Sequence, residues 1–530
     1  MLLFFTSVIA ICWILYELMI WTLSSYLIWD SVRQFSFTIW FFMSWMWIWA
    51  YFSRFLEKDA IKNFLRIEII LSILGASSVI ILKSAYMFLW NNDFSFQFIY
   101  FFLTILLWSL VWIEIPMVAE VYKQLKIKTK SIISDIFTFD YIWWLLASLL
   151  FPIILLPYLG LYNISIFIWS LNLLVAFLYL NYIKIKNKKL KILNKEFFIK
   201  YYALIFLVLL YFIFLINISG KFENVYLRSY FKEPILQTYQ TQYQNIVLTK
   251  RWDDLRMFLN WNIQFNSLDE NRYHEALVDW PLKKLIQTGQ TQGTAPTKLC
   301  RGEPCVHPIS VLVLWWWDWL AVRNLLKYSF IKNITLVELD PKMIEISQTQ
   351  KDLVKLNENS LNNPKVKIIN TDAFNFIKNT KNKYDFIIAD FPDPRDVWTA
   401  KLYSKEFYIW INWTLRNNWL FVTQSSSSFF ATKAFWSIDK TINSVFWNSL
   451  AYHRYLPSFW DWGFVLTKKS PHPNPLLWEK RGQKDFICPN LWCTGFDSDY
   501  LWENKNVEIN TLTNPKIIEY YLEGYKKYNL

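Results

Sequence analysis

Long apolar stretches fill the first 218 residues of the chain and limit what this half can fold into. Hydrophobic residues make up 54% of the whole chain, which is too high for a wholly soluble protein. Each stretch is long enough to cross a bilayer as a helix. The first one follows no basic region and precedes no small-residue cleavage site, so we interpret it as a retained helix. We expect seven spans, at residues 2–28, 34–55, 65–90, 96–121, 141–159, 162–183 and 198–217.

Basic residues in alternate loops support a multi-pass membrane domain over residues 1–218. The basic loops are Arg54–Arg66, Lys123–Lys130 and Lys184–Lys200. Basic loops stay in the cytoplasm, which places the N-terminus there and, with seven spans, the C-terminal half outside. An even number of spans would keep that half inside. The net charge of +13 fits such loops. No Lys/Arg block is typical of a nucleic-acid arm. The expected partner is therefore the lipid bilayer of the cell membrane, with no nucleic acid.

Several acidic residues lie at or near these spans. Carboxylates inside a membrane are costly and face a partner or a polar pathway. We expect most of them to pair with Arg33 or a loop lysine. The alternative is that some line a path for a cationic ligand. The residues concerned are Glu17, Asp30, Glu114, Glu120, Asp135 and Asp140.

The remaining chain divides into several parts. Residues 219–285 are rich in strand patterns, and residues 257–265 are typical of two strands joined by a turn. Residues 286–308 and 470–486 lack periodicity and favour surface insertions. The cysteine pairs in or beside them, Cys300/Cys305 and Cys488/Cys493, have a four-residue gap. This gap is wider than the usual one in structural zinc sites, so we expect no metal. Residues 309–469 alternate strands and helices, and residues 487–530 form a C-terminal extension.

The strands of residues 309–469 end in or run into acidic residues. We expect strands at 311–314, 334–338, 366–369, 386–390 and 420–424, and the first four lead to Asp318, Glu338, Asp372 and Asp390. In open α/β sheets the ligand binds beyond the carboxyl ends of the strands. The four acids therefore predict one acidic pocket rim. Such a rim favours a cationic ligand, such as a sulfonium nucleoside or an amine.

The turn after the first of these strands conflicts with its surroundings. A nucleotide-binding turn at this place needs glycine, because the backbone must approach the ligand closely. The turn instead contains Trp315, Trp316, Trp317 and Trp319 around Asp318. The chain has 31 tryptophans and only 10 glycines among 530 residues, where about 7% glycine is usual. We hypothesise that most of these tryptophans are glycine in the cell, through a code that reads UGA as glycine. The alternative is a genuinely Trp-rich membrane protein.

The spacing of the acids indicates their chemistry. Glu338 follows Asp318 by twenty residues, which suits a carboxylate that accepts the ribose hydroxyl groups. The pair Asp372-Ala373 would face an adenine. Asp390 and Asp393 lie in a loop stiffened by two prolines. Two such carboxylates suit binding a protonated amine, whose pKa is near 10, and removing its proton before it attacks.

The chain resembles the spermidine/spermine synthases, the polyamine aminopropyltransferases, over about 235–525, and the branch with a multi-span N-terminal domain over its whole length. The resemblance rests on Tyr273-His274-Glu275, Val337-Glu338-Leu339-Asp340-Pro341, Asp390 to Pro394 and Leu402-Tyr403-Ser404. The family has Gly-Gly-Gly-Asp-Gly where this chain has residues 315–319. The family also implies a class I methyltransferase-like Rossmann fold with a small N-terminal β subdomain. One departure is Phe459, which stands where soluble members carry a tyrosine that contacts the amine.

The resemblance implies a reaction and a role for each site residue. Decarboxylated S-adenosylmethionine would donate an aminopropyl group to a polyamine such as putrescine, giving spermidine and methylthioadenosine without a metal or prosthetic group. Asp390, supported by Asp393, would accept the proton. The residues that would hold the donor are Gln244, Asp318, Glu338, Asp372 and Ala373. Those that would surround the amine are Gln264, Tyr273, His274, Asp318, Asp390 and Asp393.

Two other functions remain open at this point. A methyltransferase that uses intact S-adenosylmethionine would have the same sheet. A membrane transporter or sensor would use the C-terminal domain only to bind polyamines. The sequence also leaves a homo-oligomer open.

Overall fold

The computed structural model describes the chain as two compact units, residues 1–249 and 250–530. The described residues are 2–27, 36, 39–40, 43–45, 48–49, 51–89, 93–125, 132–190, 193–231, 233–241, 243–260, 262–287, 308–315, 319–469 and 506–527. Each unit is treated by itself below.

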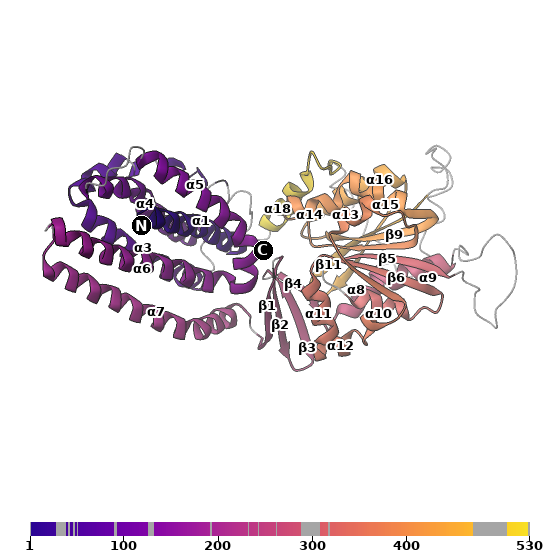
Figure 1. Cartoon of the computed structure of the whole chain (residues 1–530). Helices are drawn as coiled ribbons and strands as arrows, with labels where there is room; N and C mark the ends of the chain where they lie inside the picture. The colour runs from indigo at the N-terminus through magenta and orange to yellow at the C-terminus, as the bar shows by residue number, and fades with distance from the viewer. Residues whose placement is uncertain are drawn as a thin grey trace. The chain divides into compact units, whose positions relative to one another are not determined.

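The first unit is a bundle of long apolar helices (Figure 1). Six helical segments of the described chain are long and apolar enough to cross a membrane. They match six of the seven predicted segments. The remaining one, 34–55, is only partly described. The helices are α1 (Leu2–Leu27), α3 (Ala60–Leu89), α4 (Asp93–Gln124), α5 (Ile132–Leu150), α6 (Leu156–Leu190) and α7 (Lys195–Tyr230).

The helices of this unit pack unequally. Helix α1 packs against α5 and α6, and α3 packs against α4, α6 and α7. The interior holds large side chains that are fully buried, among them Tyr16, Trp108 and Tyr179. Helices α5 and α7 bury only small parts of their apolar windows. They expose large apolar side chains, including Leu145 and Leu149 on α5 and Phe206 and Phe214 on α7.

The last long helix continues past the predicted domain boundary. Helix α7 ends at Tyr230, so the boundary at residue 218 falls inside it. The hydropathy of the chain drops after Asn217, but polar residues also form helices, and Asn194 caps the start of α7 by accepting from Phe197 N. Strands β1 (Ile235–Gln240) and β2 (Asn245–Arg251) follow and pair antiparallel.

The second unit begins with a β-hairpin, as predicted. Strands β3 (Asp254–Leu259) and β4 (Asn262–Asn266) pair antiparallel. Asn260 in their connection has a positive φ of 45°, which a two-residue hairpin turn requires and asparagine tolerates. Trp261, the other residue of this turn, lies outside the described residues.

A seven-stranded sheet forms the centre of the second unit, in the order β10-β11-β9-β8-β5-β6-β7. The five strands β7, β6, β5, β8 and β9 run parallel, and β11 and β10 are antiparallel to their neighbours. All five predicted strands are present, and the order confirms the predicted Rossmann-like fold of the methyltransferase type. The strands are β5 (Ile309–Trp315), β6 (Ile331–Glu338), β7 (Val366–Asn370), β8 (Tyr384–Asp390), β9 (Leu415–Ser427), β10 (Leu450–Leu456) and β11 (Trp460–Lys468).

Helices cover both faces of this sheet (Figure 1). On one face lie α8 (Glu270–His274), α9 (Trp280–Gln287), α10 (Leu320–Leu326), α11 (Pro341–Thr349) and α12 (Lys351–Leu356). On the other face lie α13 (Ala373–Asn379), α14 (Val397–Ala400), α15 (Lys405–Thr414) and α16 (Thr432–Phe446). The central strand β8 is buried over its whole length, and β5 is buried from Val311 to Leu314, as a sheet covered on both faces requires.

The described part of the C-terminal extension belongs to the fold. Helix α18 (Lys516–Lys527) packs against α16, and its Ile517 and Tyr521 are part of the hydrophobic core. At Gly524 a Cβ atom would come within 2.3 Å of the carbonyl oxygen of Phe430, so only glycine allows this close approach. The insertion at 470–486 and residues 288–307 of the insertion at 286–308 lie outside the described residues.

Candidate active site

Three strands bring Glu338, Trp315 and Asp390 into one row. Trp315 of β5 is the register partner of Glu338 on β6 and of Asp390 on β8. The two acids are therefore about 10 Å apart, which is two interstrand spacings. The strand order reverses at β5, between β6 and β8. Ligands of open α/β sheets bind at such a switch point, so the row marks the candidate site.

Asp390 is buried at the end of β8 and contacts Tyr273. Asp390 is 0% exposed. The hydroxyl group of Tyr273 donates a hydrogen bond to Oδ1 of Asp390. The ring of Tyr273 packs against the ring of Phe464, with 5.3 Å between the two centroids. The structure thus brings together two of the predicted amine-site residues.

Side chains from outside the loop after Asp390 bind its backbone carbonyl groups. Tyr403 donates to the carbonyl oxygens of Phe391 at 3.1 Å and of Pro392 at 3.0 Å. The amide of Gln424 donates to the carbonyl oxygen of Phe391 as well. Together with the fixed φ angles of its prolines, these bonds define where Asp393 lies relative to Asp390.

Asp393 has a partner from the far end of the chain. The hydroxyl group of Tyr521, on α18, donates to Oδ2 of Asp393 at 3.1 Å. Arg395 donates from Nε to the same hydroxyl oxygen at 3.1 Å. Burial raises the pKa of Asp393, and Arg395 with the hydrogen bonds of Ser426, Tyr521 and Gln424 offsets part of that rise. No local sequence pattern indicated Tyr521 as a site residue.

Glu338 is buried at the end of β6, as predicted. Burial raises the pKa of its carboxyl group well above the usual value, while hydrogen bonds from the backbone partly oppose this. One of these bonds comes from Asp340 N to Oε1, at 2.8 Å. A cation or a pair of hydroxyl groups at this carboxylate would offset the cost of its burial.

Asp372 begins helix α13 and carries an ion pair. Its side chain accepts from Phe374 N at 3.2 Å, and Lys401 Nζ lies 3.0 Å from Oδ2. The residue therefore caps the helix and binds a lysine, in addition to any contact with a ligand. Ala373, the first residue of the helix, is buried and small, which suits close approach of a planar ring.

His274 faces the interior through a network with Glu270 and Arg323. Its Nδ1 lies 2.7 Å from the carbonyl oxygen and 3.0 Å from Oε2 of Glu270, so Nδ1 carries the proton. Glu270 forms a two-fold ion pair with Arg323, at 3.0 and 2.8 Å. Burial alone would raise the pKa of Glu270, but His274 and Arg323 together outweigh it and lower that pKa.

The other predicted site residues are distributed as follows. Gln264 lies within β4 and donates to the carbonyl oxygen of Asn262 at 3.2 Å. Gln244 lies in the β1–β2 turn of the first unit, where its backbone N–H donates to Thr241 Oγ1, and its approach to the acids stays a prediction. Asp318 lies outside the described residues, as do Trp316 and Trp317. The turn that departs from the family, at Ser458 and Phe459, is held by Asp269, which accepts from Ser458 N at 2.7 Å.

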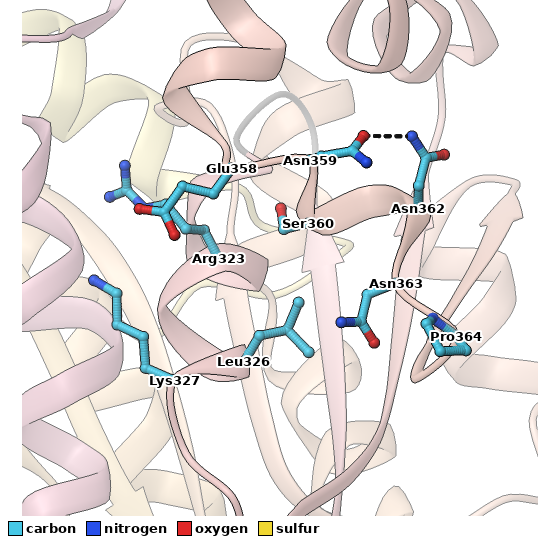
Figure 2. A pocket seen from close by; sticks show the side chains of 9 residues that line it. All are labelled: Arg323, Leu326, Lys327, Glu358, Asn359, Ser360, Asn362, Asn363 and Pro364. Carbon is cyan, nitrogen blue, oxygen red and sulfur yellow. Dashed lines mark hydrogen bonds between the residues drawn. The ribbon is translucent and has the colours of Figure 1, made fainter.

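A cavity of about 600 Å³ opens at the opposite edge of the sheet. Figure 2 shows its lining, which comes from the end of α10 and from the segment before β7. These segments precede β6 and β7, so the cavity lies at the amino ends of the strands, away from the acids. Its lining residues are Arg323, Leu326, Lys327, Glu358, Asn359, Ser360, Asn362, Asn363 and Pro364.

Comparisons with known proteins show which family the chain resembles. Residues 270–477 match the family model described as the spermine/spermidine synthase domain. The polyamine aminopropyltransferase of Leptospira interrogans is 34% identical over 97% of this chain and 96% of its own length. Polyamine aminopropyltransferase 2 of Aquifex aeolicus is also 34% identical, over 94% of both chains. A spermidine synthase structure from Thermotoga maritima covers 53% of this chain and 82% of its own, with 20% identity and a TM-score of 0.38. The first two matches extend over the helical unit as well.

Proposed function

The chain belongs to the polyamine aminopropyltransferase family, and we propose that it transfers the aminopropyl group of decarboxylated S-adenosylmethionine to a diamine such as putrescine. The observation that carries the proposal is the pair of buried acids Asp390 and Asp393. Each acid binds a tyrosine hydroxyl group, from Tyr273 and Tyr521 respectively. Both acids are buried, at 0% and 7% exposure, and two carboxyl groups three residues apart suit a cationic amine.

The proposed reaction is a direct displacement. A neutral amine nitrogen attacks the methylene carbon next to the sulfonium, a C–N bond forms, and the C–S bond breaks. Its electron pair goes to sulfur, and methylthioadenosine leaves as a neutral molecule. The nitrogen loses one proton, which Asp390 accepts and passes to solvent. Orientation and proton removal are thus the protein's contributions.

The remaining residues would hold the two substrates. Glu338 would accept the ribose hydroxyl groups, and the segment Asp372-Ala373 would contact the adenine. Gln244 and Asp318 would complete the donor site. Gln264 and His274 would lie at the amine, with Glu270 holding the imidazole in place. We propose that this reaction uses no prosthetic group.

The test is product formation by the full-length protein. With glycine at 315, 316, 317 and 319, the protein should convert decarboxylated S-adenosylmethionine and putrescine into equal amounts of methylthioadenosine and spermidine. Asp390→Asn should slow this reaction by about 10²–10⁴ without unfolding the protein. If the unaltered site gives methyl transfer from S-adenosylmethionine instead, the proposal fails.

We also propose that many tryptophans of this chain are glycine in the native protein. Trp252, Trp447 and Trp460 have φ angles of 59°, 65° and 60°, a region that costs most L-residues about 1–2 kcal/mol. All three are more than half exposed, so packing of the indole offsets little of this cost. Trp447 is also the left-handed residue that ends α16, where glycine is preferred.

The environment of Trp319 supports the same proposal. Trp319 is buried at the start of α10, and its indole N–H has no hydrogen-bond partner among the described residues. An unpaired buried donor costs about 1–3 kcal/mol. Peptide mass spectrometry of protein from its natural source tests the idea. A peptide with glycine at 315, 316, 317 and 319 is expected, and four tryptophans there would refute it.

We propose that the helical unit spans the cell membrane. The support is the exposed apolar surface of α5 and α7, since soluble proteins rarely leave large apolar patches in water. The protein should stay with the membrane fraction in alkaline carbonate and leave it only in detergent. Release by carbonate alone would contradict a spanning unit.

A further inference from the structure

Two buried carboxylates in the helical unit have no described partner. Glu68, on α3, is 0% exposed, and neither of its carboxyl oxygens has a hydrogen bond among the described residues. Glu114, on α4, is 2% exposed, and its Oε1 is likewise without a bond there. The two carboxyl groups are close enough to interact electrostatically. From the sequence we expect pairing for most of the six acids that include Glu114, with a path for a cationic ligand as the alternative, and Glu68 is not among them.

A third acid joins them from another helix. Asp140, on α5, is 2% exposed and interacts electrostatically with Glu114. Three helices therefore direct carboxyl groups into the same interior. Among the described residues of this unit, the ion pairs are Lys62–Asp59, Lys83–Glu223 and Lys123–Glu120. None of them includes Glu68, Glu114 or Asp140.

Polar and aromatic groups of α1 and α6 line the same interior. Tyr16 interacts electrostatically with both Glu114 and Glu68, and Asn172 Nδ2 donates to its hydroxyl oxygen at 3.4 Å. The other amide atom, Asn172 Oδ1, is buried without a partner among the described residues. This amide oxygen is neutral, unlike the carboxylates, and it also needs a hydrogen-bond donor.

The lining extends along α3. Gly75 lies seven residues after Glu68, which is two turns on the same face and about 10 Å along the axis. A Cβ atom at Gly75 would come within 2.7 Å of the hydroxyl oxygen of Tyr16. The unpaired acceptors are therefore spread over a length of helix. No three His, Cys, Asp or Glu side chains in the described chain lie close enough together to hold a metal ion. An elongated cation with several N–H donors fits this arrangement better than a point charge.

We propose that the interior of the helical unit binds a protonated alkyl polyamine through Glu68, Glu114 and Asp140. Its ammonium groups supply positive charges that neutralise the acids. Their N–H groups donate hydrogen bonds to the unpaired oxygens of Glu68 and Asn172. The aromatic ring of Tyr16 adds a face that attracts cations. This site is separate from the catalytic acids and gives the helical unit a role in binding the substrate or the product amine.

Equilibrium binding of radiolabelled spermidine tests the proposal. The full-length protein in lipid nanodiscs is used, without donor. An Asp390→Asn/Asp393→Asn background removes the catalytic amine site, and one spermidine per chain should still bind. Adding Glu68→Gln should weaken this binding roughly 30-fold or more, the usual loss when one partner of a buried charge pair is removed. Glu120→Gln is the matched control, because Glu120 already pairs with Lys123, and it should bind as the background does.

A second measurement uses the unaltered protein, so it does not require that a variant folds. Dicyclohexylcarbodiimide reacts with carboxyl groups in apolar surroundings, and mass spectrometry locates the modified residue. Spermidine should slow modification of Glu68 in the unaltered protein, and sodium chloride of equal ionic strength should not. No spermidine binding in the Asp390→Asn/Asp393→Asn background, or equal protection by salt, overturns the proposal. Either result leaves the aminopropyl transfer untouched, because that activity is measured separately.

Discussion

Trp315 on β5 stands level with Asp390 on β8 in the parallel pairing of the two strands. The residue that begins the unusual turn is therefore one strand away from the acid that should accept the proton. A sheet edge with a carboxylate on either side of one position, at Glu338 and Asp390, suits a cationic ligand above it.

Asp390→Asn should lower kcat by about 10²–10⁴, the usual contribution of a general base. The amide keeps the shape and still meets Tyr273, but it cannot take a proton from the amine. Turnover is measured as methylthioadenosine release with saturating substrates. Glu345→Gln is the control, because Glu345 is an exposed acid paired with Lys342. Equal turnover in both variants would show that Asp390 is not the base.

Tyr521→Phe should move the acid limb of the pH profile to higher pH. The hydrogen bond of Tyr521 stabilises the ionised form of Asp393 and lowers its pKa. Without this bond the pKa of Asp393 rises further, so a higher pH is needed to ionise the carboxyl group. The profile of kcat/KM for the amine measures the shift. Tyr520→Phe, next to it on α18, should leave the profile in place, and an unshifted Tyr521→Phe profile would contradict the role of α18.

Glu338→Gln should stabilise the ligand-free protein at pH 8 but not at pH 4. Burial raises the folded-state pKa of Glu338 above its unfolded value, so the folded state binds the proton more tightly. Stability is then lost as the pH rises from the unfolded to the folded pKa. The amide never ionises and avoids this loss. Thermal unfolding at both pH values measures the effect.

The same Glu338→Gln variant should lose affinity for the donor, measured by calorimetry with methylthioadenosine. A gain in stability together with unchanged nucleoside affinity would mean that Glu338 is buried for another reason. Glu345→Gln again provides the control for both measurements.

Glu270→Gln should cost roughly 3–5 kcal/mol of folding free energy, because it leaves Arg323 buried without its charged partner. Arg323 is only 6% exposed and has both of its terminal nitrogens on Glu270. Denaturant unfolding of the full chain, followed by a probe in the second unit, measures the loss. Glu275→Gln removes an ion pair of an exposed carboxylate with Arg454 and should cost at most about 1 kcal/mol. Similar losses in both would contradict a structural role for the network.

The sheet could be predicted from the sequence because each strand carries its own local pattern. The stretch 311–314 is a short apolar run, and β5 extends it only to Ile309–Trp315. The positions of Glu338 and Asp390 could be predicted from such strands, because the carboxyl ends of parallel strands share one edge of the sheet. The hairpin at Asn260 was predictable for a similar reason, because its turn residues lie between two alternating patterns.

Contacts between distant segments carried no local signal. Tyr521 meets Asp393 across 128 residues, and the sequence assigned its helix to an extension outside the catalytic domain. Helix α18 is amphipathic, and the buried positions Ile517 and Tyr521 are four residues apart on one face. That spacing was the available clue to a packed helix. Glu68 was missed because its helix was recognised only from its hydropathy.

Product formation by two forms of the full-length protein tests the central claim most directly. One form carries tryptophan at 315, 316, 317 and 319, and the other carries glycine there. With decarboxylated S-adenosylmethionine and putrescine, the glycine form should release methylthioadenosine and spermidine in equal amounts, and the tryptophan form should release none. The glycine form should also reject intact S-adenosylmethionine. No aminopropyl transfer by the glycine form, or methyl transfer from the intact donor, would contradict the account.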